Sequence, residues 1–205
     1  MRCELISWAR VLHLVGSLAE RIQAAGFQPD RVVAIARGGY VPARLLCDRL
    51  NLYALDSIRI AHYRAGAAKS PVARLVSTLN SDIRACNVLL VDDVADTGDT
   101  LALAVDYLRN LKPRAVKVAV LQHKSQSPFI PDFCAEEVRA WRWLVYPWAL
   151  AEDLGGFLAA MNPAPDDPEQ LVERLRWDYG IKVSTRLAQQ ILEAVAGRTA
   201  SRPAG

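Results

Sequence analysis

Four aspartates follow an apolar run at 87–91 and are the residues with the most evident chemistry: Asp92, Asp93, Asp96 and Asp99. A glycine and two threonines stand among them: Thr97, Gly98 and Thr100. A buried parallel strand delivers its C-terminal loop to the edge of a sheet where α/β proteins bind ligands. Backbone N–H groups at the start of a following helix can face an anion. Phosphate donors beside acids for hydroxyls, a metal or a proton suggest a phosphorylated sugar as ligand.

The same stretch could instead form a solvated turn with helix-capping aspartates. Against this, Asp92 and Asp93 follow the apolar run directly, and like charges this close repel unless a ligand, a metal or a donor network offsets them. The spacing of a calcium-binding loop fails because Val94 takes a ligand position. A response-regulator receiver is disfavoured because its acid pair opens the domain, whereas this pair lies far along the chain.

Strands and helices that alternate along the chain must position these residues. Apolar runs predict strands at 32–36, 53–63, 72–78, 87–91 and 115–121. Helical periodicity predicts helices from 8 towards Gly26, at 41–50 and at 100–111. This order predicts an α/β fold, with a mainly parallel twisted sheet flanked by helices on both faces. After a proline-rich break at 163–168, helices at 169–179 and 184–196 are expected, joined at Gly180.

The bulk composition sets limits on the class of protein. With 205 residues, the chain suits one main domain at 1–160 and a C-terminal helical extension at 161–205 with a flexible end. A net charge of +3 is too small to argue for nucleic acid, and no apolar segment is long enough to predict a membrane span. The four cysteines form no CxxC pair, and the N-terminus does not read as a signal peptide. We therefore expect reduced thiols and a cytoplasmic location.

The stretch 91–100, Val-Asp-Asp-Val-Ala-Asp-Thr-Gly-Asp-Thr, resembles the phosphoribosyl pyrophosphate (PRPP) motif of the type I phosphoribosyltransferases. Ala-Arg-Gly-Gly at 36–39 resembles the pyrophosphate loop of that family, and 64–71 stands where the family has its catalytic hood loop. The stretches 131–133 and 143–148 resemble the base-binding end of its 6-oxopurine members. The likeness covers about 5–155 and is greatest to the xanthine–guanine and archaeal hypoxanthine–guanine enzymes. It implies the type I phosphoribosyltransferase fold.

The resemblance implies a role for each residue of the PRPP site. Asp92 and Asp93 would bind the ribose hydroxyls and the Mg²⁺ shell, and Asp96 would accept the proton of the purine as N9 attacks. The 5′-phosphate would lie on the amides of residues 96–100, and Arg37 with the two glycines would bind pyrophosphate. The PRPP-binding residues are then Arg37, Gly38, Gly39, Asp92, Asp93, Val94, Ala95, Asp96, Thr97, Gly98, Asp99 and Thr100.

The resemblance also assigns the acceptor base. Lys124 would donate to O6 of a purine, Trp143 would stack on the ring, and Leu144 would offer backbone groups. A lone lysine in a loop is usually solvated. The tryptophan cluster could instead form core or a subunit contact, and for Trp141 and Trp148 this alternative is equally open. Where some relatives carry an acid, this chain has Val145 and Ala149. The choice among guanine, hypoxanthine and xanthine therefore stays open.

Three further residues are candidates for the hood: Tyr63, Lys69 and Arg74. A mobile cover there would exclude water and prevent hydrolysis of PRPP. The overall expectation is a purine salvage enzyme that transfers 5-phosphoribosyl from PRPP to N9 of a 6-oxopurine, with Mg²⁺, as a homo-oligomer (dimer or tetramer). The alternatives are a regulatory protein of the same fold that senses PRPP or nucleotides, and a phosphoribosyltransferase for another heterocyclic base.

Overall fold

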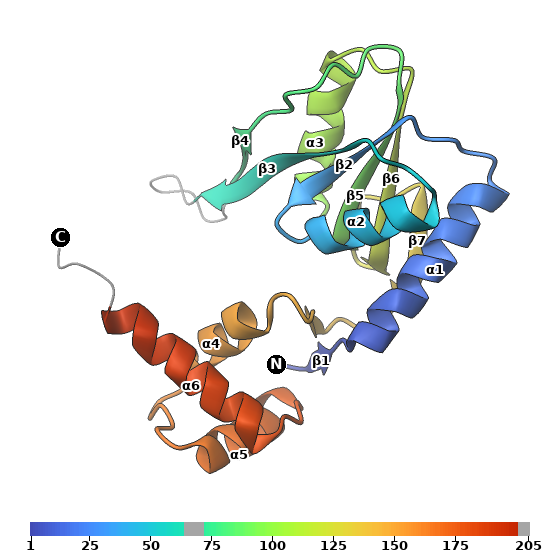
Figure 1. The fold of residues 1–205 in the computed structure, drawn as a ribbon. Helices are drawn as coiled ribbons and strands as arrows, with labels where there is room; N and C mark the ends of the chain where they lie inside the picture. Colours follow the sequence, from blue (N-terminus) through green and yellow to red (C-terminus); the bar gives the residue numbers. More distant parts are fainter. Residues whose placement is uncertain (64–71, 201–205) are drawn as a thin grey trace. The chain divides into compact units, whose positions relative to one another are not determined.

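The computed structural model describes residues 1–63 and 72–200, with only the backbone at 62–63 and 198–200. Two compact units make up the chain (Figure 1). Ala9–Ala140 form one, which we call the sheet unit. Met1–Trp8 together with Trp141–Gly205 form the other, which we call the terminal unit because it joins the two ends of the chain. The boundary expected at 160/161 is not the one by which the chain packs into units, and that boundary stays a prediction.

The sheet unit contains a six-stranded sheet in the order β4-β3-β2-β5-β6-β7. Its strands are β2 (Arg31–Ala36), β3 (Leu55–Tyr63), β4 (Val72–Ser77), β5 (Asn87–Ala95), β6 (Ala115–Lys124) and β7 (Phe133–Val138). All neighbours are parallel except β3 and β4, which pair antiparallel. The mainly parallel α/β fold expected from the sequence is therefore confirmed.

Helices cover both faces of this sheet: α1 (Trp8–Ala24), α2 (Tyr40–Arg49) and α3 (Asp99–Asn110) (Figure 1). The central strands read as unbroken apolar runs because both of their faces are buried. Alternate residues such as Val33, Leu90 and Val120 pack in one cluster with Leu101 and Leu108 of α3. The residues between them point to the opposite face and are buried as well.

The topology brings two loops to one edge of the sheet. From β2 the chain crosses to β3 on one side, and β5 then pairs on the other side of β2. This reversal of strand order is the point at which open α/β sheets bind ligands, beyond the carboxyl ends of the strands. The loop after β2 and the end of β5 therefore meet there, and they carry the glycine pair and the four aspartates.

The terminal unit is built from β1 (Cys3–Leu5), β8 (Trp143–Val145), α4 (Leu150–Ala160), α5 (Pro168–Tyr179) and α6 (Thr185–Ala200). β1 and β8 pair in parallel, and Val145 packs with the apolar side chains of all three helices. The Asp167 side chain accepts from Gln170 N and begins α5, and Gly180 ends α5 at a φ of 73°. The two helices expected in this region are confirmed, whereas the strands β1, β7 and β8 and the helix α4 were not predicted.

Two strands run further than the sequence pattern indicates. β5 extends through Asp92 and Asp93 to Ala95, and β6 extends through Lys124. The expected loop of four carboxylates is therefore wrong for its first two acids, and Lys124 ends a strand rather than lying in a loop. Parallel pairing between Val94 and Gln122 continues past the apolar runs. No helix among the described residues is long and apolar enough to cross a bilayer.

Candidate active site

The end of β5 holds two adjacent carboxylates in different surroundings. Asp92 is buried, with 9% of its surface exposed, whereas Asp93 is partly exposed. Burial raises the pKa of Asp92 well above its usual range, and the neighbouring Asp93 charge raises it further. The backbone N–H of Asp93 donates to Asp92 Oδ1 at 3.0 Å, which opposes this shift. A cation or hydroxyl donors at Asp93 would relieve the repulsion between the two.

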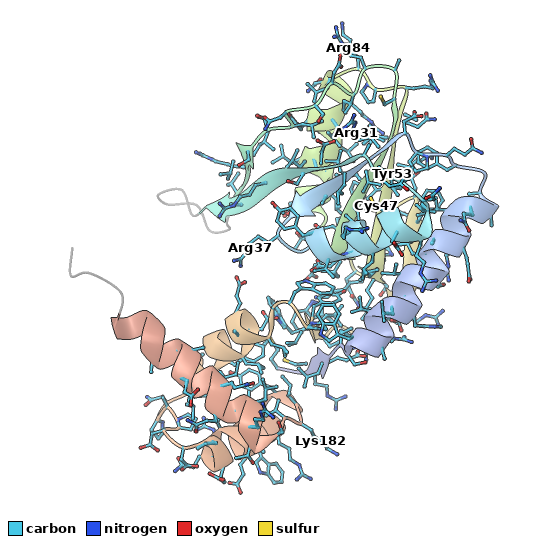
Figure 2. All side chains as sticks on the ribbon, in the orientation of Figure 1. Arg31, Arg37, Cys47, Tyr53, Arg84 and Lys182 are labelled. Carbon is cyan, nitrogen blue, oxygen red and sulfur yellow. The ribbon has the colours of Figure 1, made fainter. Side chains whose placement is uncertain are left out.

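The loop between β2 and α2 lies directly against this strand end. A Cβ added to Gly38 would come within 2.5 Å of Asp93 Oδ2. A Cβ on Gly39 would meet the carbonyl oxygen of Val91 and lie 2.8 Å from that of Ile35. Glycine at 39 therefore lets this loop approach the backbone of β2 and β5, whereas a side chain at 38 would displace the Asp93 carboxylate. The Ala36–Arg37 peptide bond is cis, and Arg37 projects from this loop (Figure 2).

A tight turn follows β5 and begins α3. Gly98 occupies the N-cap position at a φ of 85°, a conformation that favours glycine. It packs against the loop after β6, where a Cβ would overlap Phe129 and lie 3.3 Å from Ser127 Oγ. The Thr97 hydroxyl donates to Asp99 Oδ2 at 3.1 Å. The first N–H groups of a helix have no intrahelical partner, so this turn presents donors to an anion.

The acids and the turn line one cavity of about 320 Å³. Its walls are residues 92–98 with Thr100 and Leu101. Carboxylates on one side and helix N–H donors on the other match a ligand that carries both hydroxyls and phosphate. The structure thus brings together in one cavity the predicted PRPP-binding residues 92–98 and Thr100, but not Asp99, and the glycine loop lies against Asp93.

An ion pair joins Asp96 to the end of the neighbouring strand. Lys124 Nζ donates to Asp96 Oδ2 at 2.6 Å. The Lys124 side chain is only 3% exposed, whereas that of Asp96 is 39% exposed. Register explains the contact, because Ala95, the last residue of β5, pairs with His123 of β6, so Asp96 and Lys124 directly follow this pair. The proposed proton acceptor and the proposed O6 donor are thus in direct contact.

Trp143 and Leu144 lie in the terminal unit, on β8. Trp143 N donates to Arg2 O, and Val145 O accepts from Ile6 N, so both residues bond towards β1. Backbone groups alternate in direction along a parallel strand, so the N–H and C=O of Leu144 point to the other edge of β8. Among the described residues, β1 is the strand that pairs with β8, and this other edge has no strand beside it.

Aromatic rings surround this strand. Trp148 stacks on Tyr146 with ring centroids 4.8 Å apart, and Trp8 packs against Trp148 at 5.9 Å. Trp148 is therefore part of an aromatic cluster within the terminal unit, while Trp141 is 45% exposed. The Trp143 indole is hydrogen-bonded to the side chain of Asp153. Burial raises the pKa of Asp153 to about 6, although this hydrogen bond opposes the shift.

The hood residues are described in part. The backbone of Tyr63 ends β3, and Arg74 is an exposed residue of β4, opposite Ala61. Lys69 and the whole of the expected hood loop, 64–71, lie outside the described residues. The role of these three residues stays a prediction.

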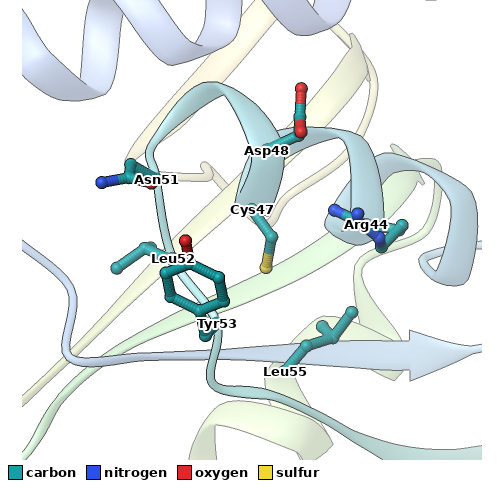
Figure 3. Close-up of a pocket in the computed structure, with 7 residues that line it drawn as sticks. All are labelled: Arg44, Cys47, Asp48, Asn51, Leu52, Tyr53 and Leu55. Atoms are coloured by element: carbon teal, nitrogen blue, oxygen red, sulfur yellow. The ribbon is translucent and has the colours of Figure 1, made fainter.

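A second cavity, of about 400 Å³, lies elsewhere in the sheet unit (Figure 3). It is lined by the end of α2 and the segment that leads into β3, including Arg44, Cys47 and Tyr53. Burial raises the pKa of the Cys47 thiol. None of the predicted site residues lines this cavity, so its size does not make it the active site.

Asp153 and the Ser127–Phe129 loop were not singled out from the sequence. Asp153 could have been noticed as an acid in the first turns of a helix, but α4 itself was not expected. Phe129 follows a polar loop, and nothing in its spacing indicates that it packs on Gly98. Both contacts depend on segments that meet only in the folded chain.

Comparison with known proteins points to one family. The phosphoribosyl transferase domain matches residues 4–153. A xanthine-guanine phosphoribosyltransferase of Ruegeria sp. is 32% identical over 156 residues, covering 71% of this chain and 85% of that protein. A purine phosphoribosyltransferase structure from Pyrococcus horikoshii is 30% identical with a TM-score of 0.63, and the match covers 72% of this chain and 94% of that chain. The structure of a Neisseria gonorrhoeae protein with bound ppGpp is 28% identical with a TM-score of 0.65, and the match covers 72% of this chain and 89% of that chain.

Proposed function

We propose that this chain, which belongs to the phosphoribosyltransferase family, transfers 5-phosphoribosyl from PRPP to N9 of a 6-oxopurine and releases pyrophosphate. The observation that carries the proposal is the contact between Lys124 and Asp96 at the mouth of the phosphate-binding turn. The Lys124 ammonium can donate to O6 of the base, and the Asp96 carboxylate can accept the proton that leaves as N9 attacks. The relatives named for xanthine–guanine and purine transfer support the same class of base.

The PRPP side of the site follows from the cavity. The turn at 96–100 supplies N–H donors for the 5′-phosphate, and Thr97 and Thr100 add hydroxyls. Gly38 and Gly39 let the loop after β2 approach the end of β5, where Arg37 adds charge for pyrophosphate. Asp93 would hold ribose hydroxyls. Positive charge that develops on the ribose as pyrophosphate departs would be stabilised by these carboxylates.

The residues present fit a Mg²⁺ ion. Among the described residues, no cluster of three or more potential metal-ligating acids, histidines or cysteines exists. Mg²⁺ commonly binds through one or two carboxylates and keeps its other positions for water and substrate phosphates, which suits Asp92 and Asp93. When bound, the ion would neutralise charge on the pyrophosphate leaving group.

Asp96 would act as the general base. Its partly exposed carboxylate lies in the cavity and is held by the Lys124 ammonium. As a 6-oxopurine enters, the O6 acceptor would compete for the Nζ–H donors of Lys124, and Asp96 would take the imidazole proton. An adenine would instead turn its 6-amino donor towards the Lys124 ammonium, so that two donors face each other at a cost of about 1–3 kcal/mol.

Trp143 and Leu144 are the other two residues that we propose to contact the base. The N–H and C=O of Leu144 face an unpaired strand edge, which suits the polar edge of a purine. Trp143, 38% exposed, would stack on its ring. We predict that the protein assembles as a homo-oligomer and acts as a salvage enzyme in the cytoplasm.

A direct assay tests the proposal. We expect PRPP- and Mg²⁺-dependent pyrophosphate release with hypoxanthine, guanine or xanthine, but not with adenine or uracil. Asp96→Asn should retain PRPP binding and lose about 10²–10⁴-fold in kcat. The matched control is Asp106→Asn, an exposed acid on α3, which should be active. Normal kcat in the Asp96 variant would refute the general-base role.

Lys124 is tested separately from Asp96. Lys124→Ala should raise the KM for 6-oxopurines. It should also lower the ratio of kcat/KM for hypoxanthine to kcat/KM for adenine. Lys182→Ala, at an exposed lysine of the terminal unit, is the control (Figure 2). An unchanged ratio of kcat/KM for the two bases would reject the role of Lys124 in selection.

A second candidate function is a nucleotide-sensing regulatory protein of the same fold. The relative with bound ppGpp favours it, because a phosphate-binding turn of this kind also suits a guanine nucleotide. Titration calorimetry with PRPP, GMP and ppGpp, beside the turnover assay, separates the two. Tight nucleotide binding without turnover of any base would favour the regulator.

A further inference from the structure

We propose that Asp153 is a positioning residue that fixes the plane of the Trp143 indole, on which the purine base stacks. The two side chains are hydrogen-bonded, the indole N–H donating to the carboxylate. Trp143 is the first residue of β8, and Asp153 lies in the first turns of α4. The inference rests on the proposed function, because it assigns Asp153 a part in binding the acceptor base.

The geometry of β8 directs Trp143 towards α4. Side chains two residues apart lie on the same face of a strand, so Trp143 shares a face with Val145. Val145 is fully buried and packs in one cluster with Leu154, the residue after Asp153. The same face of β8 therefore brings the indole to the start of α4.

A short turn holds Asp153 in place beneath that face. Ala149 N donates to Tyr146 O, and Asp153 N donates to Ala149 O at 2.8 Å. Tyr146 is itself stacked on Trp148, which anchors the turn. These hydrogen bonds and this ring stack hold the connection from β8 to α4, and Asp153 meets the indole from the first turns of α4.

A stacking tryptophan needs such an anchor. The second side-chain torsion of tryptophan has broad minima, so a ring that is 38% exposed would otherwise take several orientations. A hydrogen bond to a carboxylate holds the ring at its polar edge and leaves its faces available. The ring is then preorganised, and less conformational entropy is lost when the base stacks.

Asp153 also has a simpler possible role, as a negative charge near the N-terminus of α4. Glu152 shares that role, since it lies in the first turn and is exposed. Asparagine at 153 would keep an acceptor for the indole but lose the charge. Glu152→Ala and Asp153→Asn therefore separate charge at the helix end from positioning of the ring.

The experiment measures KM for the base and for PRPP in Asp153→Ala, Asp153→Asn and Glu152→Ala, each alone and with Trp143→Phe. We expect Asp153→Ala to raise the KM for the base about tenfold, the effect of losing one charge-assisted hydrogen bond, with the KM for PRPP unchanged. Asp153→Asn should rescue most of the loss, and Glu152→Ala should have no effect. With phenylalanine at 143, which has no N–H, Asp153→Ala should add nothing.

An indole NMR spectrum provides a readout that does not need activity. The chain has five tryptophans, and Trp143→Phe identifies the signal of Trp143 among them. In Asp153→Ala that signal should move upfield, while the other four stay. Unchanged KM for the base, an unmoved signal, or a full effect of Asp153→Ala in the phenylalanine background would each overturn the proposal. A wild-type protein that turns over no purine would refute the proposed function instead, with the indole shift intact.

Discussion

Removal of Asp96 should destabilise the protein more than removal of its partner Lys124. The two are joined at 2.6 Å, but Lys124 is 3% exposed and Asp96 is 39% exposed. Removal of Asp96 leaves the Lys124 charge largely shielded from water, which is costly. Removal of Lys124 leaves the Asp96 carboxylate, which water can solvate. The order of the two effects is therefore fixed by burial rather than by the shared bond.

The magnitudes can be worked from this geometry. Two unit charges 2.6 Å apart attract by about 6 kcal/mol at an effective dielectric constant of about 20, and desolvation of the ammonium offsets most of this. We expect Asp96→Ala to cost about 2–4 kcal/mol of unfolding free energy, below the upper range for a buried pair because water reaches the carboxylate. Lys124→Met, which fills the same space without charge, should cost about 1 kcal/mol.

Urea unfolding of the two single variants and of the double variant measures these values. The double variant should resemble Lys124→Met alone, because no buried charge remains. The control is Asp178→Ala, which breaks the exposed pair with Arg174 and should cost less than about 0.5 kcal/mol. A larger loss in Lys124→Met than in Asp96→Ala would refute the reasoning from burial.

The other predictions concern the glycine loop, pH and metal. Gly39→Ala should lower stability by about 1–3 kcal/mol and weaken PRPP binding in a fluorescence titration, because its Cβ meets the backbone of Val91 and Ile35. The pKa of Asp153 is raised to about 6 in the folded protein, so the free energy of unfolding should fall as the pH rises from about 4 to about 6. Above pH 6, Asp153→Asn should be more stable than the wild type by about 1 kcal/mol in urea unfolding, a value kept small because Asp153 is partly solvated. EDTA should abolish turnover and excess Mg²⁺ restore it, with Asp93→Asn needing more Mg²⁺.

The sequence predicted the central layout because apolar periodicity reports burial. The runs that became β2 and β5 are buried on both faces, and the motif at 91–100 follows the second. The ends of β5 and β6 were missed for the same reason. Asp92 and Lys124 are polar, yet backbone hydrogen bonds to neighbouring strands continue through them, and these do not depend on side-chain polarity.

Other elements gave weak signals. β7 lies at the edge of the sheet and contains Glu136 and Glu137. Several of its side chains are only partly buried, so the strand has no continuous apolar run. α4 contains Gly155 and Gly156, which lower helix propensity, but its apolar side chains pack with α5 and α6. Packing overrode propensity there, and a window of sequence does not contain that information.

In the proposed function, register in the terminal unit would decide which backbone groups are offered to a base. β1 has only three residues, too few for a periodic signal, yet its pairing with β8 directs Leu144 to the open edge. A slip of one residue would direct Trp143 and Val145 there instead and send the Trp143 side chain to the other face. Specificity that depends on backbone groups in this way does not require the acids that some relatives carry at 145 and 149. Residues near the N-terminus would thus help to select the base, although no motif marks them.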